Sequence, residues 1–219
     1  MGGYLRELFA ALDLARLQSA ALRVAAVFLC LTVHESCHGL AALALGDPTA
    51  KKMHRLSLNP LRHIDWLGLA MMFAAGFGWA KPVPVDPRYF RNPKWGMALT
   101  ALAGPVSNFL LAALAILLSK AIFLWSPEGV FWAGMFFFLL YMAAPLSIGL
   151  GVFNLLPFPP LDGSKVAAAL LPDRIYVQWM RYERYGMAVL LAVTLLGWRM
   201  NFIGGAIDWI YEFLLKLIY

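Results

Sequence analysis

Residues Ala20–Leu45 read AALRVAAVFLCLTVHESCHGLAALAL, a largely apolar run that is long enough to cross a bilayer as one α-helix. His34, Glu35 and His38 interrupt this run within five residues. Ionisable groups are unfavourable at membrane depth and occur there mainly where they serve a function. The run therefore predicts a transmembrane helix that carries a chemical site.

The spacing of these three groups predicts a metal site. His34 and His38 are four residues apart, so they lie on one face of a helix and can share a tetrahedral metal ion, normally Zn²⁺. Glu35 follows the first histidine and can reach a water on the metal to accept its proton. We expect Cys37, between the histidines, to pack against neighbours rather than to bind the metal. A chance match to the motif is the alternative, and it fits a membrane helix poorly.

The composition indicates a polytopic membrane protein. The 219 residues are 62% hydrophobic and only 14% charged, with a mean hydropathy of +0.70. Soluble domains are about half apolar and about a quarter charged. The formal charge of +6 is better explained by basic cytoplasmic loops than by a nucleic-acid surface, so we expect the lipid bilayer and no nucleic acid among the partners.

We expect an all-α helical bundle in a single membrane-embedded domain, residues 1–219. Changes in hydropathy predict an amphipathic surface helix over residues 1–18, a membrane core over 20–163 that contains the predicted metal site, and a C-terminal helical hairpin over 186–219. In the core, we expect spanning helices at residues 20–45, 95–125 and 130–156, with a polar loop from 157 to about 185.

Loop charge predicts the topology. Lysines and arginines favour the cytoplasmic side, which places loops 46–62, 81–94 and 157–185 inside and the turn 126–129 outside. These assignments agree only if the short apolar stretch 64–80 re-enters the membrane instead of spanning it. His38 and Asp162 then both lie toward the cytoplasmic side, in an integral, multi-pass protein of the cell membrane.

The segment Lys81-Pro-Val-Pro-Val85 predicts a short extended strand near the site. Its two prolines leave one strand edge without donors, while Val83 and Val85 keep their backbone groups on the other edge. An extended peptide segment can pair with that edge, and the amides of Asn154 and Asn108 can hold its other side. A proline-stiffened linker is the alternative.

Two motifs together resemble the site-2 protease family of intramembrane zinc metalloproteases. They are His34-Glu-Ser-Cys-His38 and Asn154-Leu-Leu-Pro-Phe-Pro-Pro-Leu-Asp162-Gly163. The likeness extends through further segments in the family's order, Leu56–Asp65, Gly78–Val85 and Ala103–Asn108, and it covers roughly Thr32 to Gly163. The chain has no room for the PDZ or CBS domains of many relatives, so it resembles a small form of the family.

The resemblance implies His34, His38 and Asp162 as zinc ligands, Glu35 as the general base and Asn154 as a substrate-binding residue. It implies a prokaryotic metalloendopeptidase that hydrolyses peptide bonds in or next to transmembrane segments of other proteins. Zinc-bound water activated by Glu35 would be the nucleophile. A metal or proton transporter, or a catalytically inactive relative that binds membrane proteins, is the alternative reading.

Overall fold

The computed structural model describes residues 14–75, 78–126, 131–196 and 201–219, and the protein is all-α over these ranges. Residues 1–13 and the turn 127–130 lie outside the described residues, so the predicted surface helix and outer turn are not part of this description. The helices are α2 (Leu14–Ala44), α3 (Thr49–Lys52), α4 (Trp66–Ala75), α5 (Pro93–Trp125), α6 (Phe131–Asn154), α7 (Asp162–Ala169), α8 (Asp173–Leu195) and α9 (Asn201–Ile218), with 3₁₀ turns η1 (Pro60–Arg62) and η2 (Pro87–Tyr89).

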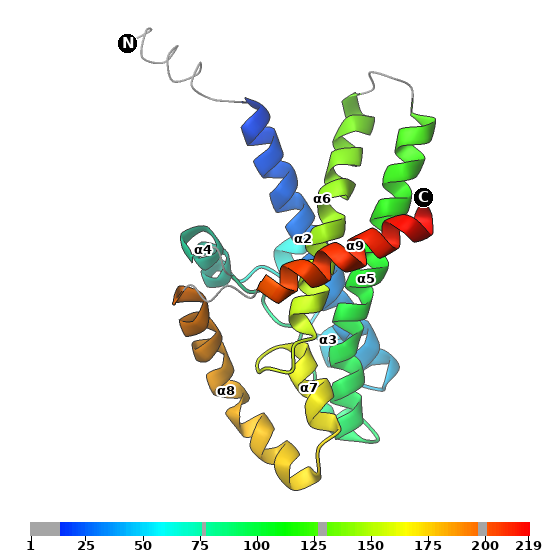
Figure 1. The fold of residues 1–219 in the computed structure, drawn as a ribbon. Coiled ribbons are helices and arrows are strands. Elements are labelled where there is room, and N and C mark those ends of the chain that lie inside the picture. Colours follow the sequence, from blue (N-terminus) through cyan, green and yellow to red (C-terminus); the bar gives the residue numbers. More distant parts are fainter. Residues whose placement is uncertain (1–13, 76–77, 127–130, 197–200) are drawn as a thin grey trace.

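Three of these helices are long and apolar enough to cross a membrane, as the sequence predicts. They are Arg16–Ala44 in α2, all of α5, and Ala133–Asn154 in α6. The three pack against one another, and Figure 1 shows them as the upright core of the molecule. The chain is therefore a multi-pass membrane protein.

Helix α5 packs closely because small side chains form one stripe along it. The stripe residues Gly96, Thr100, Gly104 and Asn108 recur at every fourth position, and all four are buried. Asn92 caps the helix by accepting the Trp95 N–H, and proline occupies the first position, where no N–H is needed. This stripe lets the backbones of neighbouring helices approach one another.

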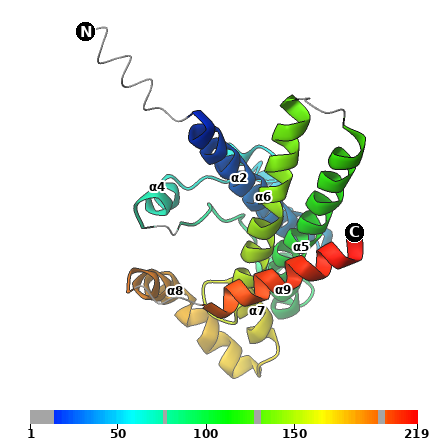
Figure 2. The same ribbon diagram turned by 45° about the horizontal axis from the view of Figure 1, so that its top comes forward.

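The stretch 64–80 turns back on itself, as the loop charges predict. Ile64 and Ala80 form an antiparallel bridge, and the Lys81 N–H donates to the His63 carbonyl at 2.8 Å. The two ends of the stretch therefore lie side by side, and α4 between them has only ten residues. Figure 2 shows α4 beside the bundle rather than within it.

The C-terminal third differs from the expected polar loop. Helices α7 and α8 occupy most of residues 157–185, because their apolar residues recur with the period of a helix and form no continuous apolar run. Helix α9 packs across α6 and α5, and α8 contacts α7. The C-terminal hairpin and the surface helix stay predictions, because residues 197–200 and 1–13 lie outside the described residues.

Candidate metal centre

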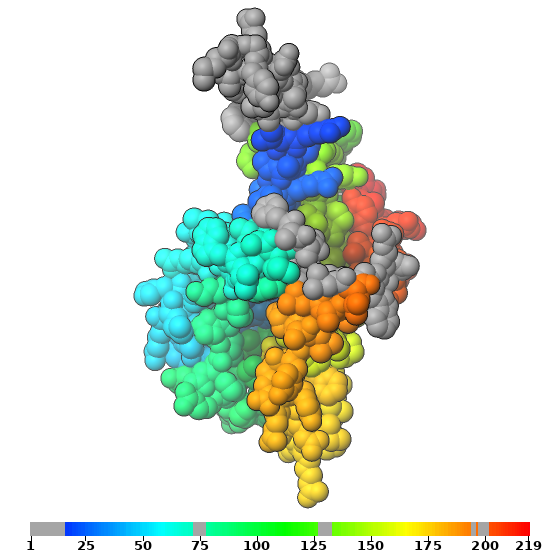
Figure 3. All heavy atoms as spheres, turned by 90° about the vertical axis from the view of Figure 1, so that its left-hand side faces the viewer, coloured from blue at the N-terminus to red at the C-terminus, as the bar shows by residue number. Residues whose placement is uncertain are grey.

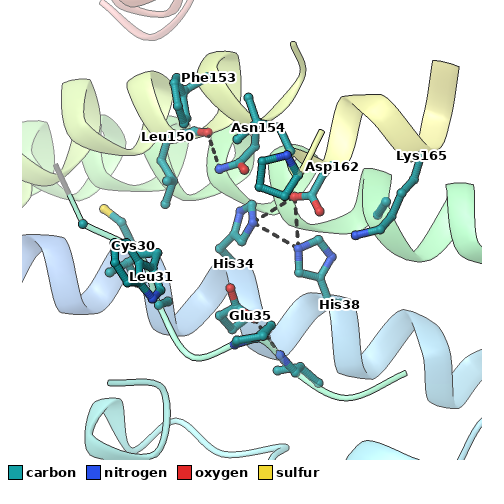
Figure 4. A pocket seen from close by; sticks show the side chains of 18 of the residues that line it. Cys30, Leu31, His34, Glu35, His38, Leu150, Phe153, Asn154, Asp162 and Lys165 are labelled. Carbon is teal, nitrogen blue, oxygen red and sulfur yellow. Dashed lines mark hydrogen bonds and ion pairs between the residues drawn. The ribbon is translucent and has the colours of Figure 1, made fainter. Parts of the chain in front are cut away.

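Two histidines of α2 and the first residue of α7 converge on one point. His34 Nε2 lies 3.0 Å from His38 Nε2, and Asp162 Oδ2 lies 3.1 Å and 3.2 Å from these two nitrogens. Figure 4 shows the three side chains directed toward one another across the space between the helices. His34 and His38 are buried, and Asp162 is mostly so. Within the described residues this is the only group of at least three His, Cys, Asp or Glu side chains with metal-binding geometry, and it does not include Cys37.

The tight path of the chain before α7 places Asp162 at this point. A Cβ on Gly163 would lie 2.6 Å from the Leu156 carbonyl oxygen, so only glycine fits against the end of α6. The Ser164 hydroxyl donates to the Leu161 carbonyl at 2.7 Å and closes the first turn of α7. A carboxylate in that turn also interacts favourably with the helix dipole. The segment after Asn154 thus returns the chain to the two histidines.

The hydrogen bonding of His38 prepares it to bind a cation. Its Nδ1 lies 2.7 Å from the Thr100 carbonyl oxygen, which can only accept, so Nδ1 carries the proton. In a neutral imidazole the lone pair is then on Nε2, the atom that faces His34 and Asp162. A backbone carbonyl on the far nitrogen is the usual outer partner of a metal-binding histidine.

The residues present fit a zinc ion. Ligand atoms bound at about 2.0–2.1 Å by one tetrahedral zinc lie about 3.3 Å apart, close to the separations of the three atoms here. Two imidazoles and one carboxylate leave a fourth position, as catalytic zinc requires. Burial raises the pKa of the Asp162 carboxyl, but the adjoining His34 and His38 rings outweigh burial and hold this pKa below its ordinary value. Asp162 therefore carries a negative charge that suits the binding of a cation.

Gly104 of α5 provides the surface on which both imidazoles rest. A Cβ at this position would lie 2.5 Å from His38 Nε2 and 2.6 Å from His34 Cε1. In the sequence, Gly104 and Thr100 are only two members of a stripe of small or polar residues, a pattern typical of helix packing, and nothing in it indicates their contacts with the histidines. The neighbouring Pro105 was the available signal, because a proline inside a transmembrane helix disturbs the carbonyls of the preceding turn.

Glu35 lies beside the two histidines and contacts the extended segment. Its Oε2 accepts the Val83 N–H at 3.0 Å. Further anchors hold the segment in place: the Lys81 N–H pairs with His63, Arg55 donates to the Lys81 carbonyl, and the Asp86 N–H donates to buried Asp47. The edge that carries Lys81 and Val83 is therefore partly occupied by the protein itself.

A cavity of about 800 Å³ opens onto the three convergent side chains. Glu35, Val83, Val85 and Asn154 line it, together with residues from α6 and α8. The Asn154 amide donates to the Leu150 carbonyl at 3.0 Å, as Figure 4 shows. Asn108 is fully buried and is not among the residues that line this cavity. Figure 3 shows α8, in orange, next to α4, in blue-green, on one face of the molecule.

Comparisons with known proteins agree with this geometry. The sequence model of peptidase family M50 matches residues 127–197. The chain is 40% identical over 171 residues to "Putative zinc metalloprotease YwhC" of Bacillus subtilis, covering 76% of this chain and 77% of that protein.

Two mycobacterial proteins are also similar. The chain is 31% identical over 202 residues to "Putative zinc metalloprotease Rip2" of Mycobacterium tuberculosis, with 85% and 70% of the two chains covered. It is 32% identical over 148 residues to the protein of the same name in Mycolicibacterium smegmatis, with 64% and 53% covered. No solved structure matches the chain.

The Bacillus subtilis protein and the family model together show which family the chain is related to. The convergent His, His and Asp side chains form a group that could hold a metal ion. The chain belongs to the site-2 protease family, peptidase family M50.

Proposed function

We propose that this protein hydrolyses peptide bonds in or next to transmembrane segments of other proteins. In this proposal His34, His38 and Asp162 bind the zinc, and Glu35 is the general base. The observation that carries it is the convergence of two imidazole nitrogens and one carboxylate oxygen within 3.2 Å of one another, beside a carboxylate that does not belong to this triangle. A single membrane-embedded domain supplies all four groups.

Zinc at this site supplies a Lewis acid that polarises the scissile carbonyl and lowers the pKa of the attacking water. The Glu35 carboxylate takes the proton from that water and later delivers it to the leaving amine nitrogen. Hydrogen bonding to the Val83 N–H fixes the orientation of the carboxylate and leaves its other oxygen free for the proton. His34 and His38 are buried, and electrostatic effects are stronger in such surroundings than in water.

The substrate must lose its helical hydrogen bonds before its carbonyl can reach the site, because a helix hides its backbone groups. The segment 81–85 offers replacement partners. The Val83 carbonyl and the Val85 N–H make no hydrogen bond within the described residues, and both residues line the cavity. We assign these groups to one extended substrate residue, with the Asn154 amide on the opposite wall.

The charge of the loops next to the site supports an orientation in the membrane. The cavity contacts segment 78–85 and helix α7, and both adjoin the basic loops that favour the cytoplasm. We therefore propose a protein of a prokaryotic cell membrane that cleaves near the cytoplasmic surface. Its partners are transmembrane protein substrates and the surrounding lipid.

Glu35→Gln tests the assignment of the base in the purified, zinc-loaded protein. The amide keeps the size of the side chain but cannot accept a proton as a carboxylate does, so zinc content should be unchanged while cleavage of single-span substrates falls by several orders of magnitude. Glu212→Gln is the matched control, because the Glu212 side chain is exposed on α9 and its carboxylate lies 4.0 Å from Lys216 on the helix surface. Undiminished cleavage by Glu35→Gln would refute this function for Glu35.

A further inference from the structure

Asn108 is the most unusual polar residue of the bundle. It is fully buried in α5, and neither the oxygen nor the nitrogen of its side-chain amide has a hydrogen-bond partner within the described residues. Besides the backbone hydrogen bonds of the helix, its carbonyl accepts from the Ser147 hydroxyl at 2.8 Å. A buried unsatisfied amide is unfavourable by roughly 1–3 kcal/mol, so such a group requires an explanation.

The two histidines of the metal centre differ in whether their Nδ1 atom has a hydrogen-bond partner. Nδ1 of His38 is held by the Thr100 carbonyl, whereas Nδ1 of His34 is buried and has no partner among the described residues. A histidine that binds metal through Nε2 usually donates its other ring N–H to an acceptor, which sets the tautomer and the ring orientation. His34 Nδ1 and the Asn108 amide are thus two of the buried polar groups that have no partner among the described residues.

These two groups lie over the same turn of α5. The His34 ring contacts Gly104 through Cε1, the carbon bonded to Nδ1, since a Cβ at Gly104 would lie 2.6 Å from it. Asn108 follows Gly104 by four residues, so the two share a helix face at about 5–6 Å. Because side chains on a helix tilt toward its N-terminus, the Asn108 amide leans toward the turn of Gly104.

We propose that Asn108 positions His34 through one buried water molecule. The His34 Nδ1–H donates to the water, and the water donates to the amide oxygen of Asn108. Two hydrogen bonds of about 2.8 Å let one water join polar atoms about 4.5–5.5 Å apart, and buried waters typically serve such otherwise unsatisfied groups. The arrangement fixes the lone pair of His34 on Nε2, which faces the metal position.

This inference rests on the proposed role of His34 as a zinc ligand, and it gives Asn108 a role in metal binding rather than in contacting substrate. Asn108 is then the counterpart of the Thr100 carbonyl. Helix α5 supplies the outer partner of both histidines of α2, through a backbone group for one and a side chain for the other.

Zinc affinity of the purified, full-length protein tests the proposal, measured by competition with a chromogenic chelator. Asn108→Leu keeps the branched shape of the side chain and removes the amide, so the Kd for zinc should rise about 10–100-fold. Asn108→Asp keeps an acceptor oxygen for the water and should bind zinc within a few-fold of the wild type. Ser147→Ala is the matched control, because it deletes a buried hydrogen bond at the same turn without changing the amide.

Zinc affinity of Asn108→Leu within twofold of the wild type would overturn the proposal, as would equal losses in Asn108→Leu and Asn108→Asp. If the leucine variant does not fold, an experimental structure of the zinc-loaded wild type tests the proposal instead. The proposal requires a water molecule that bridges His34 Nδ1 and the Asn108 amide. A different partner on His34 Nδ1 would refute the proposal. His34→Ala separates the two hypotheses. Full zinc binding by that variant would contradict the ligand set itself, whereas its loss alongside normal affinity in Asn108→Leu would contradict only the role of Asn108.

Discussion

Adding a single methyl group at Gly104 should damage the metal centre. In Gly104→Ala the new Cβ would lie 2.5 Å from His38 Nε2 and 2.6 Å from His34 Cε1. Carbon atoms reach favourable contact only at about 3.5–4.0 Å, so each ring must move by about 1 Å or α5 must move away from α2. Either response separates the histidines from the geometry that one zinc ion requires.

The size of the effect follows from the cost of overpacking. Inserting a methyl into a well-packed site destabilises it by about 1–3 kcal/mol. If the zinc-bound state carries this strain, the Kd for zinc rises about 5–150-fold, since about 1.4 kcal/mol corresponds to a factor of ten. Cleavage should fall at least as much at limiting zinc, because a displacement of about 1 Å also disturbs the reacting groups.

Zinc competition and cleavage of a single-span substrate measure the two effects in the same preparation. Gly134→Ala is the matched control: it makes the same substitution in spanning helix α6, where a Cβ would meet nothing within 4 Å. This control should bind zinc and cleave as the wild type does. A folded Gly104→Ala protein with wild-type zinc affinity and activity would refute the view that both imidazoles rest on this glycine.

Two further outcomes are expected. Val83→Pro removes the N–H that orients Glu35, while leaving every proposed zinc ligand in place, so cleavage should fall at least tenfold with normal zinc content. Wild-type cleavage of several substrates by this variant would leave segment 81–85 as a linker. Single cysteines at Arg91 and Glu128 should react with a membrane-impermeant thiol reagent from opposite sides, Arg91 from the cytoplasm and Glu128 from outside. Labelling of position 91 from outside would contradict the topology, although the bridge between Ile64 and Ala80 would still require stretch 64–80 to return to its starting side.

Much of the architecture could be predicted from local patterns in the sequence. The apolar runs in α2, α5 and α6 exceed the thickness of a bilayer, and a segment in lipid must satisfy its backbone internally, so these runs have to be helices. The four-residue spacing of His34 and His38 likewise places both on one face of any helix. The distribution of basic and uncharged loops likewise predicts that stretch 64–80 enters the membrane and returns to the same side.

The C-terminal helices were harder to predict for a physical reason. Helix α8 is amphipathic and carries charged residues along its first half, so hydropathy alone does not reveal it. Its Glu183 pairs with Lys165 of α7 at 3.1 Å, a contact that depends on the folded arrangement. Helix α9 docks through Ile207, Ile210 and Leu214 on a surface that α5 and α6 create together.

The sequence by itself therefore determined the membrane environment, the spanning helices and the single turn that presents His34, Glu35 and His38, because each depends on residues within one helix. Only the tertiary structure decided what surrounds that turn. It brings Asp162 to within 3.2 Å of both histidines, places the Thr100 carbonyl on His38, and sets Gly104 against both rings. Such contacts join residues far apart in the chain, and side-chain packing between helices, rather than any local pattern, determines which of them meet.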